Sequence, residues 1–130
     1  MTVGILLVTH SDIGPALLQA ATRMLGRLPM RSAAFEVPFD ADLERLLPAA
    51  SAALRSVDEG GGVLILTDLY GASPSNLAAR LAQLGTPVQR IAGLNLSMLL
   101  RCCNYAEQPL EELVRTAANG GRNGVISGHG

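Results

Sequence analysis

The sequence predicts an α/β fold in which helices wind over both faces of a mainly parallel, four-stranded sheet. Two aliphatic runs, residues 3–8 and 63–66, are continuous and short, which is typical of strands buried on both faces. Along the whole chain, strand patterns alternate with segments that repeat apolar residues at helical spacing. Right-handed crossovers between such units favour a doubly wound sheet.

Length and composition limit the classes of function. The chain has 130 residues, enough for one domain with one core, with 48% hydrophobic and 16% charged residues. A net charge of −1 gives no electrostatic basis for binding nucleic acid or an anionic membrane. No apolar run is long enough to span a bilayer, and the first one lacks the basic residues of a secretory signal. We therefore expect a cytoplasmic protein.

The first half of the chain is expected to form two strand–helix units. Residues 3–9 form the first strand, and Pro15 suits the first turn of the helix that follows. Residues 33–37 form a second strand, which a proline ends. Asp40 is expected to cap the second helix, and Pro48 to kink it or break it into two.

The second half repeats this alternation. Residues 63–67 form the third strand, and Ser73 is expected to cap the helix after it. Residues 88–92 form a fourth strand, Asn95 caps the next helix, and Pro109 opens the last one.

The end of the chain is expected to leave that helix and form one more short strand. Asn-Gly-Gly at residues 119–121 indicates a helix stop, and residues 123–127 follow with a strand pattern. Too little sequence follows to bury this strand, so it belongs at an edge of the sheet or against another subunit. Residues 1–126 are thus expected to form a single domain, and residues 127–130 a disordered tail.

Cysteine and histidine usage predicts neither a disulfide nor a metal site. Cys102 and Cys103 are adjacent and are the only cysteines, which indicates two reduced thiols on a helix. The second histidine, His129, lies in a terminal Gly-His-Gly sequence without metal-ligand spacing. We expect no metal and no cofactor.

The candidate site lies where the first and third strands end. Each strand runs into a polar turn, Thr-His-Ser with His10 and Thr-Asp with Asp68. If the two strands are neighbours, His10 and Asp68 meet at the carboxyl edge of the sheet, where open α/β sheets bind ligands. An aspartate beside a histidine fixes the imidazole tautomer and stabilises the cation that forms when the other nitrogen reacts.

The helix that Ser73 and Pro74 open adds an anion site beside this pair. Its free backbone N–H groups, positive dipole end and hydroxyl suit a phosphate. Together with His10 and Asp68, these groups predict phosphoryl transfer through a phosphohistidine. The sequence has no lysine, no GxGxxG and no paired acids for magnesium, so the donor is expected to be a phosphoprotein and not ATP.

Each residue alone has a plainer interpretation. A histidine after a strand is often only a hydrogen-bonded turn residue. Asp68 alone is interpreted as a turn or capping residue, and residues 71–74 as a tight strand-to-helix turn. The functional hypothesis rests on their combination at one edge of the sheet.

Three motifs resemble the mannose-family IIA domain of the bacterial phosphoenolpyruvate-dependent sugar phosphotransferase system (PTS). They are Thr-His-Ser at residues 9–11, Leu-Thr-Asp-Leu-Tyr-Gly-Ala-Ser-Pro-Ser-Asn at residues 66–76, and Ile-Ala-Gly-Leu-Asn-Leu-Ser-Met-Leu at residues 91–99. The resemblance implies that His10 accepts a phosphoryl group on Nε2 from the phosphocarrier protein HPr and passes it to a IIB domain. The chain would then be a phosphotransferase.

The resemblance also implies roles around the histidine. Asp68 bonds to His10, and Ser73 holds the phosphate together with the backbone N–H groups of Ala72 and Ser73. Thr9, Thr67 and Gly71 support the site. Dimers of the family exchange the C-terminal strand, which implies a homodimer. The sequence departs from the family pattern at Ala72, usually glycine, at Ser97, usually proline, and at Pro48; none of these removes a chemical group.

Four functions fit these observations. The first is a phosphocarrier that serves sugar uptake. The second is a regulatory IIA protein that binds a partner according to its phosphorylation state, without transport. The third is a phosphoryl donor to dihydroxyacetone kinase, whose third-strand turn usually lacks the Gly-x-Ser-Pro pattern seen here. The fourth is a binding module without phosphotransfer, which the intact His10, Asp68 and Ser73 disfavour.

Overall fold

The computed structural model describes residues 1–128, so His129 lies outside the described part of the chain. The strands are β1 (Gly4–His10), β2 (Ser32–Val37), β3 (Val63–Thr67) and β4 (Val88–Ala92). The helices are α1 (Ile13–Leu25), α2 (Leu43–Val57), α3 (Ser73–Leu81), α4 (Leu96–Asn104) and α5 (Leu110–Asn123). No described helix has both the length and the apolar character needed to cross a membrane.

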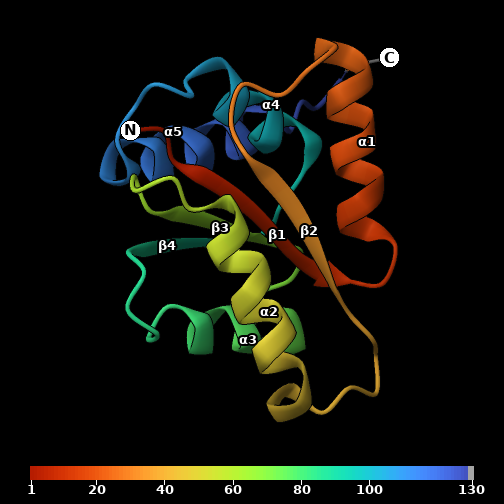
Figure 1. Ribbon diagram of the computed structural model, residues 1–130. Helices are drawn as coiled ribbons and strands as arrows, with labels where there is room; N and C mark the ends of the chain where they lie inside the picture. Colours follow the sequence, from red (N-terminus) through yellow and green to blue (C-terminus); the bar gives the residue numbers. More distant parts are fainter. Residues whose placement is uncertain (129–130) are drawn as a thin grey trace.

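The four strands form one parallel sheet in the order β2-β1-β3-β4 (Figure 1). The two aliphatic strands, β1 and β3, are therefore the inner pair, and Val8 lies opposite Thr67. Because parallel strands end at the same edge, the turns after β1 and β3 are neighbours. The predicted doubly wound α/β fold is confirmed.

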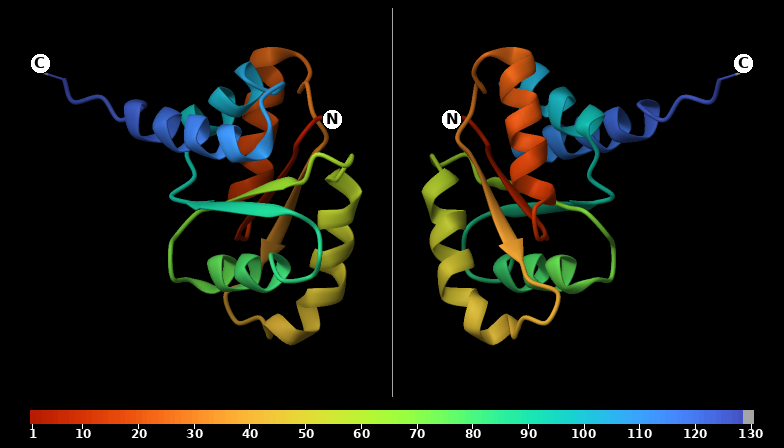
Figure 2. Two further views of the ribbon diagram at one scale, coloured as in Figure 1. Left: turned by 90° about the vertical axis from the view of Figure 1, so that its left-hand side faces the viewer. Right: turned by 90° about the vertical axis from the view of Figure 1, so that its right-hand side faces the viewer.

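Helices cover both faces of this sheet (Figure 2). On one face, Ile5 and Leu7 pack with side chains from α1, α4 and α5. On the other face, Leu6 and Val8 pack with side chains from α2 and α3. These four side chains of β1 are completely buried, as expected for a strand with a core on both sides.

Helix α2 differs from the prediction at its start and in its middle. Asp42 caps it, since its carboxylate accepts a hydrogen bond from the Glu44 N–H at 3.0 Å, and Asp40 lies outside the helix. Pro48 lies on the exposed side of one continuous helix, so of the two predicted alternatives the break into two helices is wrong, and the kink stays a prediction. Burial of Ala50 and Leu54 against the sheet holds the helix in place despite the lost backbone donor.

Helix α5 continues through the predicted stop. Gly120 and Gly121 are buried helix residues that face α4. A Cβ at Gly120 would lie 2.5 Å from the Cβ of Arg101, and one at Gly121 would lie 2.7 Å from the Cε of Met98. The two glycines therefore allow close packing of α4 and α5, and they do not end the helix.

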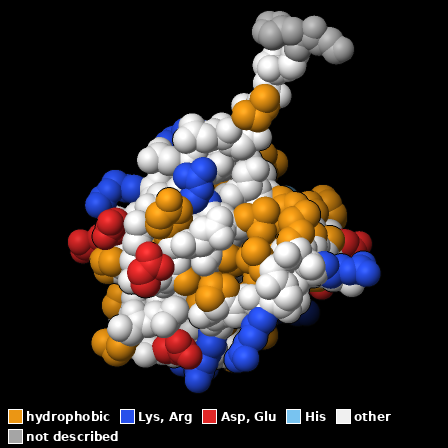
Figure 3. Space-filling model, turned by 90° about the horizontal axis from the view of Figure 1, so that it is seen from above, with side chains coloured by type: hydrophobic (Ala, Val, Ile, Leu, Met, Phe, Trp, Pro, Cys, Tyr) orange, Lys and Arg blue, Asp and Glu red, His pale blue; other side chains and the backbone are white. Residues whose placement is uncertain are grey.

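The described residues after α5 form no strand within this chain. Val125 and Ile126 are 77% and 81% exposed. The segment extends away from the body of the protein with hydrophobic side chains on its surface (Figure 3). Pairing of this segment with another subunit stays a prediction.

Cys102 and Cys103 are free, buried side chains of α4. Burial raises the pKa of the Cys102 thiol to about 12, and burial also raises the pKa of Cys103. Both cysteines therefore pack as small apolar groups, not as reactive thiols.

The start of β1 tolerates no side chain at Gly4. A Cβ there would overlap the backbone carbonyl of Val57 at the end of α2, whose carbonyl carbon would lie 2.7 Å away. We expect Gly4→Ala to lower the free energy of unfolding by about 1–3 kcal/mol, because backbone must move to make room. Urea unfolding followed by circular dichroism measures this. Gly128→Ala, where a Cβ meets nothing within 4 Å, is the control, and equal stability of the two variants would contradict the prediction.

Candidate functional site

The end of β1 and the end of β3 bring His10 and Asp68 together. His10 is the last residue of β1, and Asp68 directly follows β3. The Nδ1 atom of His10 lies 2.8 Å from Oδ2 of Asp68, and the backbone N–H of His10 donates to the same oxygen at 3.0 Å. One carboxylate oxygen thus holds both the ring and the backbone of the histidine.

This pair is largely shielded from solvent but remains accessible. The side chains of His10 and Asp68 are 16% and 11% exposed. Oδ1 of Asp68 is buried and has no hydrogen-bond partner among the described residues, so the carboxylate interacts through Oδ2 alone. Because a carboxylate only accepts hydrogen bonds, the neutral imidazole carries its proton on Nδ1 and its lone pair on Nε2. The imidazole is therefore arranged as a nucleophile at Nε2.

Two buried threonines fix the strand ends that carry the pair. The hydroxyl of Thr9 donates to the carbonyl of His10 and accepts from the N–H of Gly14, each at 2.8 Å. These bonds tie the end of β1 to the first turn of α1. Thr67 connects β3 to the next strand and its turn, since its hydroxyl donates to the Ile91 carbonyl at 3.4 Å and its carbonyl accepts from the Leu94 N–H at 2.9 Å.

Helix α3 begins at the same edge of the sheet. The helix starts at Ser73 with Ala72 as its N-cap, one residue earlier than predicted, because Ala72 is the last residue with extended backbone. No side chain caps this end. The first N–H groups of a helix have no partner within it, so they and the Ser73 hydroxyl can bind an anion. Gly71 precedes them with a φ of +82°, a left-handed conformation that favours glycine.

Phe39 is a residue of the site that the sequence pattern did not predict. Its ring stacks on the imidazole of His10, with the ring centroids 4.7 Å apart and the planes inclined by 22°. Phe39 follows β2, and β2 pairs with β1 so that His10 lies opposite Val37. The sequence does show an aromatic residue just after the second strand. Only the pairing of β2 with β1 places that residue beside His10.

The turn after His10 has a second contact that the sequence did not reveal. Asp12 adopts a left-handed φ of +74°, and its N–H donates to Oε1 of Glu36 at 2.6 Å. Because Glu36 belongs to β2, this bond ties the turn after His10 to the neighbouring strand.

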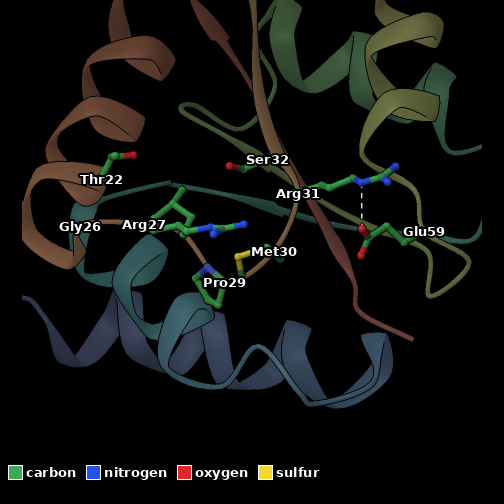
Figure 4. Close-up of a pocket in the computed structure, with 9 residues that line it drawn as sticks. Thr22, Gly26, Arg27, Pro29, Met30, Arg31, Ser32 and Glu59 are labelled. Carbon is green, nitrogen blue, oxygen red and sulfur yellow. Dashed lines mark ion pairs between the residues drawn. The ribbon is translucent and has the colours of Figure 1, made fainter.

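A separate hollow lies at the opposite, amino end of the sheet (Figure 4). Its lining includes Gly26, just after α1, and Ser32, the first residue of β2. Arg31 and Glu59 form an ion pair in it at 2.8 Å. It contains none of the predicted site residues. Among residues 1–128, no group of three or more His, Cys, Asp or Glu side chains is placed to hold a metal ion.

Comparisons with known proteins agree with this geometry. Residues 4–118 match the family described as PTS system fructose IIA component, EIIA-man. The PTS system mannose-specific EIIAB component of Escherichia coli (strain K12) is 33% identical over 127 residues, which cover 96% of this chain and 39% of that protein. The transcriptional regulatory protein LevR of Bacillus subtilis (strain 168) is 29% identical over 119 residues, or 88% of this chain and 12% of that protein.

A solved structure has the same fold. The mannose/sorbose specific IIA subunit of the phosphotransferase system from Enterococcus faecalis superposes with a TM-score of 0.86 at 23% identity, covering 99% of this chain and 96% of that one. The chain spans about two fifths of the length of the Escherichia coli relative, and a smaller part of the Bacillus protein. The family model matches most of the chain, and the identity to the mannose-specific relative agrees with it. The chain therefore belongs to the EIIA-man family of PTS IIA components.

Proposed function

We propose that this protein is a cytoplasmic phosphocarrier of the sugar phosphotransferase system. His10 accepts a phosphoryl group from phospho-HPr and passes it to a IIB component, which serves sugar uptake and phosphorylation. The observation that carries the proposal is the bond between Nδ1 of His10 and Asp68, which leaves the lone pair of Nε2 free. Family membership supports the same chemistry.

In the proposed transfer, the Nε2 lone pair forms a bond to the phosphorus of the donor. The bond from phosphorus to the donor nitrogen breaks, and that nitrogen keeps the electron pair. The proton on Nδ1 stays in its hydrogen bond, so positive charge develops on the imidazole of His10. The carboxylate of Asp68, 2.8 Å away, stabilises this charge. Passage to the acceptor reverses these steps.

The start of α3 holds the phosphoryl oxygens in this proposal. The Ser73 N–H and hydroxyl bind them, and so does the Ala72 N–H once it leaves its 3.5 Å bond to the Leu69 carbonyl. The positive end of the helix dipole favours the charge of the phosphoryl oxygens. Gly71 supplies the turn that presents these groups. Thr9 ties the end of β1 to the start of α1, and Thr67 ties the end of β3 to β4.

The test is intact mass after incubation with phosphoenolpyruvate, enzyme I and HPr. We expect one phosphoryl adduct that acid removes, because phosphohistidine is acid-labile. The reaction without HPr is the control and should give no adduct. Absence of the adduct, while HPr in the same tube is phosphorylated, would contradict the proposal.

A second candidate function is regulation by phosphorylation state, without sugar transport. The similarity to the transcriptional regulatory protein LevR favours it, since that relative carries a matching segment within a regulator. Reconstitution with a IIB component distinguishes the two functions. Transfer of the phosphoryl group from His10 to IIB supports the carrier. A protein that binds only one of the two states of this chain, together with no transfer to IIB, supports the regulator.

We also propose that the protein forms a homodimer through its C-terminal segment. Within residues 1–128, strand β4 pairs on one side, with β3, so its other edge can accept a strand. A groove of about 240 Å³ beside that edge is lined by Ile91, Met98 and Val125, among other residues. Val125 and Ile126 are exposed apolar residues that a partner would cover.

Truncation after Asn123 is therefore expected to convert dimer to monomer. Sedimentation equilibrium measures the mass, with removal of residues 129–130 alone as the control. The full-length variant Val125→Asp with Ile126→Asp should also be monomeric, because charges oppose burial of the strand. An unchanged mass for both the truncated chain and the double variant would show that strand exchange is wrong here.

A further inference from the structure

Phe39 contacts the candidate nucleophile although it has no place in either core. It is 80% exposed, and neither hydrophobic cluster of the described chain contains it. Its aromatic contact is the stack on His10, with a centroid distance of 4.7 Å. A large apolar side chain held on the surface in this way contributes little to folding, which leaves the contact with His10 to be explained.

The stack restrains a motion that Asp68 leaves open. The hydrogen bond from Nδ1 to Oδ2 fixes one corner of the imidazole, but the ring can still tilt about that bond. An aromatic ring against the face of the imidazole, inclined by 22°, opposes such tilting. Asp68 at the edge and Phe39 at the face together define the direction in which Nε2 points. Holding a reacting atom in line is a main source of rate in phosphoryl transfer.

The same contact is electrostatically favourable during transfer. The face of a phenyl ring carries partial negative charge, and the nearly parallel stack turns this face toward His10. Positive charge develops on His10 when Nε2 bonds to phosphorus, as described above. The face of the aromatic ring therefore attracts the positive charge on the imidazole ring, an attraction that the neutral imidazole lacks.

We propose that Phe39 is a positioning residue for phosphoryl transfer, which orients the His10 ring by stacking and stabilises the charge that forms on it. This inference rests on the proposed phosphocarrier function. The turn after β2 thereby takes part in the chemistry, as do the turns after β1 and β3.

Substitutions that separate aromatic character from apolar bulk test this role. Phe39→Leu keeps an apolar side chain without a ring, and Phe39→Tyr keeps the ring. Leu84→Ala removes an exposed apolar side chain far along the chain from the site and is the control. The readouts are the NMR shifts of the His10 ring protons in the unphosphorylated protein, and the kcat and KM for phospho-HPr.

We expect Phe39→Leu to move the His10 ring-proton signals downfield, because ring-current shielding is lost. We also expect it to lower kcat about 2- to 10-fold with KM unchanged, the range that one aromatic pair contributes. Phe39→Tyr should keep the shielding of the His10 ring protons and restore most of the kcat that Phe39→Leu loses, whereas Leu84→Ala should match the unsubstituted protein in both readouts.

The outcomes distinguish failure of this inference from failure of the proposed function. Unchanged His10 signals in Phe39→Leu would show that the rings do not stack and would overturn the inference, whether or not phosphorylation occurs. A raised KM with unchanged kcat would make Phe39 a docking contact for HPr and would also overturn it. If the unsubstituted protein is not phosphorylated while its His10 signals show the stack, the proposed function fails, and the role in transfer fails with it.

Discussion

His10→Ala should abolish phosphoryl labelling by phospho-HPr. The substitution removes the only imidazole among residues 1–128, and neither Asp68 nor Ser73 can replace a nitrogen nucleophile in this position. His129→Ala is a matched control, because His129 is the only other histidine in the sequence, and it should be labelled in full. Intact mass and acid lability of the adduct measure both variants.

The fold should survive the loss of the His10 side chain. Asp68 keeps one of its two bonds, because the backbone N–H of residue 10 still donates to Oδ2. Circular dichroism and thermal unfolding should therefore resemble those of the unsubstituted protein. Labelling retained in a folded His10→Ala protein would place the phosphoryl group on another residue and refute the proposed mechanism.

Asp68→Ala should slow transfer to His10 roughly 10- to 100-fold, the factor expected from losing a hydrogen bond to a charged group. Without the carboxylate the imidazole loses its fixed tautomer, and the positive charge of the phosphorylated ring loses the negative charge 2.8 Å from Nδ1. Asp68→Asn should transfer at a rate between those of Asp68→Ala and the unsubstituted protein. Its amide oxygen can still accept a hydrogen bond but carries no charge. Rapid-quench measurement of phosphohistidine formation follows each rate.

Asp42→Ala provides the matched control for this substitution. Asp42 is also a carboxylate that accepts a backbone hydrogen bond, but it caps α2 and has no contact with His10. Its loss should lower the free energy of unfolding by about 1 kcal/mol and leave the transfer rate unchanged. An Asp68→Ala protein that transfers as fast as Asp42→Ala would show that Asp68 is only a turn residue.

The sequence predicted the inner part of the fold well because burial on both faces leaves a strong local pattern. The aliphatic runs of β1 and β3, each followed by a polar turn, are enough to place His10 and Asp68 at one edge of the predicted sheet. Contact between His10 and Asp68 also requires that the two strands are neighbours, and the strand order shows that they are.

The features that the sequence did not predict depend on packing between distant segments. Two adjacent glycines such as Gly120 and Gly121 are typical of the end of a helix. Here they lie inside α5 because α4 packs too close for side chains at these positions. Asp40 and Asp42 are both good capping residues, and the structure shows Asp42 in that role, with its carboxylate accepting from the Glu44 N–H. The stack of Phe39 on His10 needs the pairing of β2 with β1, which one sequence cannot supply.

The order β2-β1-β3-β4 has a consequence for where a partner protein can approach. From β1 the chain passes to β2 through α1 on one face of the sheet, whereas from β3 it passes to β4 through α3 on the other face. The two turns that carry His10 and Asp68 thus diverge to opposite sides as they leave the sheet. Such a topological switch point leaves a crevice between diverging loops, where a ligand group can reach the strand ends. In this protein the switch point coincides with the His10–Asp68 pair, so the strand order places the pair where partners approach open α/β sheets.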